Sequence, residues 1–128
     1  MQIIKADNYR QLAILGANII ADQVKHKPNS ILGLATGSSP VGIYEKLVEL
    51  YQKEHLDFSQ VQTVNLDEYC SLSPSDPQSY HYFMEQHLFR HLNIQKENTH
   101  IPNGLEADPQ KACDDYNQLL ESLGSVDL

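Results

Sequence analysis

Five small, polar or stiff residues interrupt the stretch LGLATGSSPVGIYEKL at 32–47, between an apolar run and a helical pattern. They are Thr36, Gly37, Ser38, Ser39 and Pro40. The first amides of a helix have no partner within it, and with the helix dipole they attract anions. Small residues also let a phosphate approach the backbone. The loop is a candidate phosphate site, although a plain turn uses the same residue types.

The loop matches neither common nucleotide motif. It lacks the Gly-x-Gly-x-x-Gly pattern of dinucleotide sites and the Gly-Lys-Ser/Thr ending of the P-loop. We therefore do not expect a phosphorylated ligand bound here to be a nucleotide.

Asp67 and Glu68 directly follow a second predicted strand, at 61–66. In an open parallel sheet, ligands bind beyond the carboxyl ends of the strands, where this pair and the loop at 36–40 would both lie. The two strand ends would be about 5 Å apart as neighbours, or about 10 Å apart with one strand between them. Either spacing suits a sugar phosphate, with a carboxylate as general base on a carbon acid. A helix cap or a solvated turn acid is the alternative.

The elements that must position these residues alternate between strand and helix patterns. Continuous apolar or extended runs predict strands at 2–6, 31–35, 61–66 and 99–102, and the opening of another at 125–128. Helical spacing predicts helices at 9–26, at 41–51, from about Ser79, and from Pro109 to Gly124. Alternating strands and helices predict an α/β fold, a Rossmann-like parallel sheet with helices on both faces, left incomplete at the C-terminal end.

Caps at the helix starts follow from residue types. Asp7 or Asn8 can cap the first helix and Asp108 the last. For the helix after the loop, the pattern predicts Ser39 as N-cap and Pro40 as first helical residue.

Length, charge and cysteine content narrow the class of protein. The 128 residues suit one domain, and 41% hydrophobic with 20% charged residues is typical of a folded globular chain. The formal net charge of −8 argues against a nucleic acid partner. No apolar run approaches the ~20 residues that cross a bilayer, so no membrane partner is expected. Cys70 and Cys113 form no C-x-x-C pair, which indicates free thiols and a cytoplasmic location.

Other polar clusters are weaker candidates for chemistry. His87 and His91 lie four residues apart on a helix, but no third ligand is evident, so we predict no metal site. The serines at 71, 73 and 75 lie outside any Gly-x-Ser-x-Gly elbow, which argues against a serine nucleophile.

Taken together, the segments resemble the glucosamine-6-phosphate deaminase family. The matching pieces are LGLATGSSP at 32–40, LDFSQVQTVNLDEY at 56–69, SYHYFM at 79–84, HIPNG at 100–104 and CDDYNQLLESLGSVDL at 113–128. They follow one another in order over nearly the whole chain.

The resemblance implies a reaction and roles for residues. The family converts glucosamine 6-phosphate and water to fructose 6-phosphate and ammonia. Asp67 would be the base that moves the C2 proton towards C1, and Thr36, Gly37, Ser38 and Ser39 would line the phosphate end. Glu68, Ser79 and Tyr80 complete the predicted substrate-binding set, with Glu68 shaping the loop.

The resemblance also carries expectations about class and partners. No metal or organic cofactor is expected, because the substrate's own amine and carbonyl supply the electron sink. The implied enzyme class is a hydrolase acting on a C–N bond, in amino-sugar catabolism. The implied partners are a small sugar phosphate and a homo-oligomer.

The chain departs from the family in one respect. The family's later Gly-rich loop, its ring-opening histidine and its later basic groups are not in this sequence. Residues 1–128 are therefore expected to be the N-terminal part of a single domain and inactive alone. A 6-phosphogluconolactonase-like hydrolase and a non-catalytic sugar-phosphate-binding fragment are the alternatives, and the run Asn65-Leu66-Asp67-Glu68-Tyr69 favours the deaminase.

Overall fold

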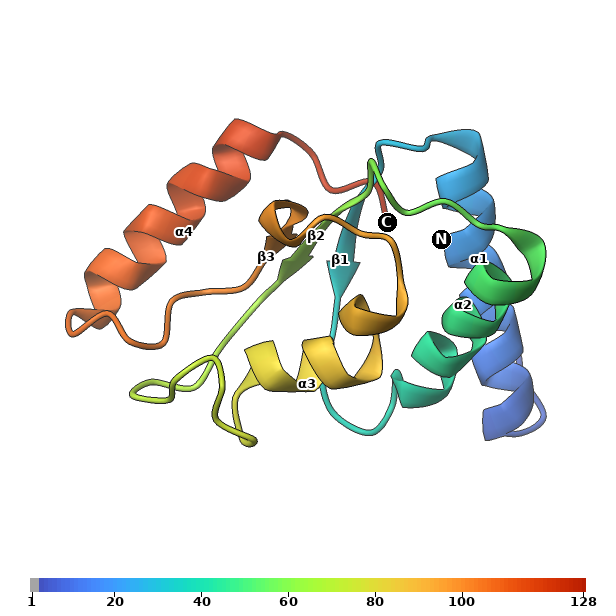
Figure 1. The fold of residues 1–128 in the computed structure, drawn as a ribbon, viewed down its shortest axis with the longest axis horizontal. Coiled ribbons are helices and arrows are strands. Elements are labelled where there is room, and N and C mark those ends of the chain that lie inside the picture. Colours follow the sequence, from blue (N-terminus) through green and yellow to red (C-terminus); the bar gives the residue numbers. More distant parts are fainter. Residues whose placement is uncertain (1–2) are drawn as a thin grey trace.

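A computed structural model describes residues 3–128, and in it three parallel strands lie between helices (Figure 1). The strands β1 (Ile31–Leu34), β2 (Gln62–Asn65) and β3 (Thr99–His100) pair in that order. Leu34 is aligned with Asn65, so β1 and β2 end level with each other. The strands predicted in these three regions are confirmed. Since β1 and β2 are neighbours, the shorter of the two predicted spacings, about 5 Å, applies.

Within the described residues, four α-helices connect the strands: α1 (Tyr9–His26), α2 (Val41–Glu54), α3 (Tyr80–His87) and α4 (Pro109–Leu123). Two 3-10 turns, η1 (Phe89–His91) and η2 (Lys96–Asn98), lie between α3 and β3. The side chains of Asn8, Ser79 and Asp108 accept amide hydrogen bonds at the starts of α1, α3 and α4. These three helices thus begin with a residue type that caps well.

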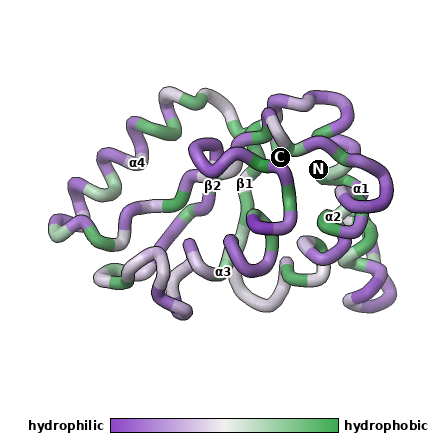
Figure 2. The backbone as a smooth tube through the Cα atoms, in the orientation of Figure 1, coloured by the Kyte–Doolittle hydropathy of each residue, from purple (hydrophilic) through white to green (hydrophobic). Residues whose placement is uncertain are grey.

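The helices cover both faces of the sheet. Leu32 and Leu34 of β1 belong to one buried cluster with residues of α1, α2 and α3, among them Ala17, Leu47 and Met84. Figure 1 shows α4 on the other side of the strands from α1 and α2. In Figure 2 hydrophobic and hydrophilic residues alternate along α4, as expected for a helix with one covered side. The predicted α/β architecture is confirmed.

Two local predictions are wrong. Residues 3–6 form no strand, and Gln2 lies outside the described residues. One edge of β1 pairs with β2 and its other edge bonds to residues 127–128, so no β1 edge is left for the N-terminal segment. The helix α2 starts at Val41, with Pro40 as N-cap and no side-chain cap bond, so Ser39 is not the cap.

The predicted further strand corresponds to a short segment bonded to β1. The Asp127 amide donates to the Ile31 carbonyl at 2.9 Å, and the Gly33 amide donates to Leu128 at 2.8 Å. The Asp127 carboxylate also accepts from the Ile31 amide and pairs with Lys27 at 2.7 Å. Residues 126–128 thus extend the sheet on the side of β1 opposite β2.

Tyr44 of α2 holds the end of β1 by a hydrogen bond. Its side chain is 2% exposed, and its hydroxyl donates to the Ala35 carbonyl at 2.5 Å, one residue before the loop at 36–40. Burial raises the pKa of Tyr44 to about 12, although the hydrogen bond to Ala35 opposes that rise. The Tyr44 hydroxyl is therefore the side chain that bonds to the Ala35 carbonyl at the end of β1.

We expect Tyr44→Phe to lower the free energy of unfolding by about 1–2 kcal/mol, because the Ala35 carbonyl loses its partner inside the protein. Urea denaturation would measure the change. Tyr82→Phe, in a half-buried ring on α3, serves as the matched control. Equal losses in both variants would contradict the role assigned to the Ala35 bond.

Candidate active site

The loop between β1 and α2 contains a glycine, Gly37, with a positive φ. Gly37 has a φ of 90°, a conformation that side-chain-bearing residues rarely adopt, and a Cβ there would meet no atom within 4 Å. Pro40 is helical in backbone, and its carbonyl accepts the first helical bond, from the Tyr44 amide at 3.0 Å. The N-cap residue Pro40 has no side-chain acceptor for the first amides of α2, and the Gly42 amide of that turn donates instead to the Tyr9 hydroxyl at 2.9 Å.

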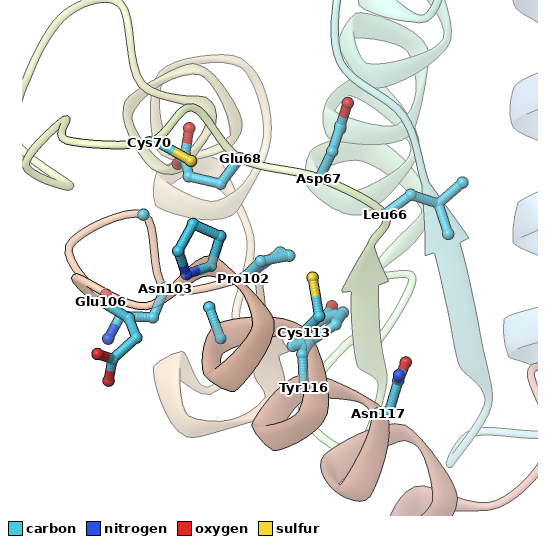
Figure 3. A pocket seen from close by; sticks show the side chains of 13 residues that line it. Leu66, Asp67, Glu68, Cys70, Pro102, Asn103, Glu106, Cys113, Tyr116 and Asn117 are labelled. Atoms are coloured by element: carbon cyan, nitrogen blue, oxygen red, sulfur yellow. The ribbon is translucent and has the colours of Figure 1, made fainter.

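The neighbouring strand end carries Asp67. Asn65, the last residue of β2, is 1% exposed and donates from its side-chain amide to the Leu34 carbonyl at 2.9 Å. This bond ties the end of β2 to the end of β1. Asp67 follows two residues later and is exposed. In Figure 3 its carboxylate points away from Cys113 and Tyr116, beyond the end of the strand.

Glu68 faces the protein interior although it is next to Asp67. Its side chain is only 1% exposed. The carboxylate accepts from the backbone amides of Tyr80 at 2.8 Å and His81 at 3.0 Å, and from its neighbour Tyr69 at 2.8 Å. The His81 ring Nδ1 lies 2.7 Å away as a fourth partner. Glu68 therefore connects the β2 loop to the first turn of α3, where negative charge is favoured.

Two opposing effects act on the ionisation of Glu68. Burial raises the pKa of its carboxyl, since it penalises the charged form. The hydrogen bonds from the Tyr80 and His81 amides, the His81 ring and the Tyr69 amide lower it, and the net pKa is below the usual glutamate value. Glu68 is thus held as a carboxylate with every partner supplied by the protein.

Tyr80, the first residue of α3, lies near the ends of both strands. Its ring lies against Tyr69, with the ring centroids 4.8 Å apart. The hydrogen bond with Tyr69 raises the pKa of Tyr80, the hydrogen bond with Thr36 lowers it, and the nearby Asp67 charge raises it, with a net rise. One phenol therefore lies beside Thr36 of the loop and within the field of Asp67.

The structure places the predicted site residues in two groups. Thr36, Asp67 and Tyr80 lie together at the C-terminal ends of β1 and β2. Ser79 is 1% exposed, and its hydroxyl accepts from the Tyr82 amide and donates to the Pro74 carbonyl, so it holds the start of α3. Glu68 likewise turns to α3, while Ser38 and Ser39 are exposed in the loop.

The loop after β3 supports the segment that carries Asp67. The Ser71 amide donates to the Gly104 carbonyl at 2.7 Å, and a Cβ at Gly104 would collide with the Tyr69 carbonyl oxygen. Tyr116 of α4 donates to the carbonyls of Asn65 and His100, at 2.7 and 3.0 Å. Between these parts lies a pocket of about 250 Å³, whose lining residues include Cys70, Pro102, Cys113 and Tyr116 (Figure 3).

Sequence reasoning missed several of these residues. Tyr9 and Tyr116 were predicted only as parts of helices, and Gly104 only as the end of the matching segment HIPNG. Nothing local to them signals a role, because their partners at 38–42, 65 and 69 are distant in sequence. Because Cys70 and Cys113 are far apart in the sequence, no local pattern indicated that they line the same pocket.

The histidines weighed as metal ligands have other neighbours. The His87 ring stacks on Phe83 with centroids 4.4 Å apart, and the His91 ring contacts the Gln86 carbonyl at 2.9 Å. Over residues 3–128 no group of three or more potential ligands gathers around one point. No described helix is long and apolar enough to span a membrane.

Comparison with known proteins identifies the family and the fold. The family described as "Glucosamine-6-phosphate isomerases/6-phosphogluconolactonase" matches residues 5–128. A glucosamine-6-phosphate deaminase of Thermoanaerobacter sp. (strain X514) is 50% identical over 128 residues, which is 100% of this chain and 51% of that protein. A solved monomeric glucosamine-6-phosphate deaminase superposes with a TM-score of 0.96 at 43% identity, over 99% of this chain and 53% of the other.

The fold is also found in a 6-phosphogluconolactonase. A 6-phosphogluconolactonase from Thermotoga maritima shares the fold at 20% identity, with a TM-score of 0.72 over 94% of this chain and 53% of the other. The chain belongs to the glucosamine-6-phosphate isomerase/6-phosphogluconolactonase family. It spans about half the length of the curated relatives it matches.

The expected enzyme class is wrong. The sequence was interpreted as a hydrolase acting on a C–N bond, but the family description names isomerases and the relatives are named deaminases. The resemblance to deaminases itself is confirmed, and the 6-phosphogluconolactonase is a distant neighbour.

Glu68→Gln tests the link between the β2 loop and α3. We expect it to lower the free energy of unfolding by about 2 kcal/mol at pH 7, because an amide replaces a charged acceptor of several hydrogen bonds. The folded-state pKa of Glu68 is lowered, so its contribution is fully present above its unfolded pKa and is lost as pH falls through the folded value. The difference between wild type and variant should therefore shrink in acid.

Urea denaturation at pH 7 and pH 3 would measure this difference. Glu85→Gln removes an exposed carboxylate from the same helix and provides the control. A deficit of the same size at both pH values would show that the charge of Glu68 is not what stabilises the link.

Proposed function

We propose that this chain supplies the base and the phosphate loop for the isomerising deamination of glucosamine 6-phosphate to fructose 6-phosphate and ammonia. This reaction belongs to amino-sugar catabolism, where N-acetylglucosamine is degraded. In the proposal, Asp67 removes the proton from C2 of the open-chain sugar, the proton is delivered to C1, and water releases ammonia from the C2 imine.

The observation that carries the proposal is the level ending of β1 and β2. It puts the exposed Asp67 carboxylate beside Thr36 at neighbouring strand ends, where open parallel sheets bind ligands. A hexose phosphate has several bonds between its phosphate and C2, so the loop can hold one end while Asp67 reaches the other. The Tyr80 phenol is close enough to both Thr36 and Asp67 for each to affect its pKa, and it is assigned to the substrate-binding set.

Support for a phosphate at the loop comes from its chemistry. Thr36, Ser38 and Ser39 offer hydroxyl donors, Gly37 keeps the backbone open, and the N-cap Pro40 places no side-chain acceptor over the first amides of α2. Such a nest of donors can bind an anion on a protein of net charge −8. Glu68 and Ser79 are assigned the role of positioning, since both bond to the start of α3.

We further infer that residues 1–128 form one part of a larger sugar-phosphate domain. Leu66, directly before Asp67, is 89% exposed, which suits a surface completed by other residues. The two free thiols, Cys70 and Cys113, suit a cytoplasmic location. We also propose that the protein forms a homo-oligomer, which sedimentation would test.

Asp67→Asn should lower kcat for glucosamine 6-phosphate by about 10²-fold or more, with KM changed far less, since only the base is removed. Ammonia release by the natural gene product would measure both constants, and Asp22→Asn, an exposed position in α1, is the control. Exchange of the C2 proton with deuterated solvent isolates the step. A variant that still exchanges at the wild-type rate would remove Asp67 from the role of base.

Gly37→Val should weaken binding of glucosamine 6-phosphate and leave unphosphorylated glucosamine little affected. The backbone at φ 90° is strained for any other residue, by about 1–3 kcal/mol, so the loop would change shape. Titration calorimetry with both sugars would measure the selectivity. Equal weakening of both would point to general damage, and hydrolysis of 6-phosphogluconolactone without ammonia release would refute the deamination.

A further inference from the structure

The hydroxyl of Tyr9 contacts three backbone groups around the loop between β1 and α2. It accepts a hydrogen bond from the Gly42 amide at 2.9 Å. It also lies 3.1 Å from the Ser38 carbonyl oxygen and 3.2 Å from that of Ser39, to which it donates. A phenol has one proton, so the two carbonyls share it. One side-chain oxygen of α1 thus joins the loop to the start of α2.

Packing at the start of α2 makes room for this contact. A Cβ at Gly42 would lie 3.0 Å from Tyr9 Cε1 and 3.1 Å from the Tyr9 hydroxyl, and would also press on Ala13. The absence of a side chain at 42 therefore lets the ring of Tyr9 reach the helix. The ring itself is 53% exposed, so its burial adds little to the core. The hydroxyl is the part of Tyr9 that the fold engages.

The contact also sets the direction of the loop's peptide groups. In a trans peptide the carbonyl and the following N–H point in opposite directions. Because the Ser38 carbonyl points to Tyr9, the Ser39 N–H points away from α1. The next peptide has no N–H, since residue 40 is proline. Tyr9 occupies the Gly42 amide and leaves the Ser39 amide directed to the other side of the loop.

We propose that Tyr9 is a positioning residue for phosphate binding: its hydroxyl holds the Ser38 and Ser39 carbonyls on the α1 side, so that the Ser39 amide faces the anion. This inference rests on the proposed function, since it takes the loop at 36–40 as the phosphate-binding part. Tyr9 does not itself touch the ligand. Its loss should therefore weaken ligand binding and leave the proton-transfer step unchanged.

Tyr9→Phe tests the inference, because it removes only the hydroxyl. Tyr51→Phe, in the last turn of the same α2 and half-buried, is the matched control. The probe is glucitol 6-phosphate, which lacks a carbonyl and cannot react, and its Kd is measured by calorimetry on the natural gene product. We expect Tyr9→Phe to raise this Kd, and KM for glucosamine 6-phosphate, roughly fivefold to twentyfold, with kcat within about twofold. Tyr51→Phe should match the wild type.

Several outcomes would overturn the assignment. They are an unchanged Kd in Tyr9→Phe, an equal rise in Tyr51→Phe, and a fall in kcat at unchanged Kd. If a thermal melt showed Tyr9→Phe unfolded at the assay temperature, the hydroxyl would be assigned to stability instead. A wild type that does not bind glucitol 6-phosphate would also refute the proposed role of Tyr9. A wild type that binds glucitol 6-phosphate but releases no ammonia from glucosamine 6-phosphate would refute only the deamination, because the ratio of Kd values still decides on Tyr9.

Discussion

The parallel pairing of β1 with β2 is the constraint on which the candidate site depends. Its register sets Leu34 opposite Asn65, and the buried Asn65 amide bonds to the Leu34 carbonyl at the strand ends. A slip of one residue would turn Leu32 and Leu34 out of the core, since strand side chains alternate between faces. The core therefore enforces the register, and the register sets the distance between the loop and Asp67.

Two adjacent carboxylates differ in role because their surroundings differ. Asp67 is exposed at the strand end, whereas Glu68 is buried with three backbone amides and the His81 ring around it. The bonded amides of α3 orient the first turn of that helix, and Tyr80 occupies its first position. Glu68, which is not the proposed base, thereby positions the Tyr80 phenol near Thr36 and Asp67.

What the sequence predicts well here depends on short-range patterns. The caps at Asn8, Ser79 and Asp108 bond to amides within three residues. Residue type was enough to predict Asp108 and to narrow the first cap to Asp7 or Asn8, whereas Ser79 was predicted only as a substrate-binding residue near the start of a helix. Ser39 has the same residue type, yet it does not cap α2, because Pro40 and the Tyr9 contact shape that turn. Long-range contacts decide the rest of the site. Gly104 lies against the Tyr69 carbonyl, and no pattern within HIPNG contains that neighbour.

Three tyrosines on three helices hold the C-terminal edge of the sheet in the same way. Tyr44 donates to Ala35 before the loop, Tyr9 to Ser38 and Ser39 within it, and Tyr116 to Asn65 and His100 at the next two strands. Each bond satisfies a carbonyl that the sheet leaves open, and it adds no charge beside a proposed anion site. Two of the three phenols are buried enough that their pKa values are raised to about 12, so they stay neutral donors at physiological pH. Neutral hydroxyls thus fix the backbone at this edge of an acidic protein without adding charge there.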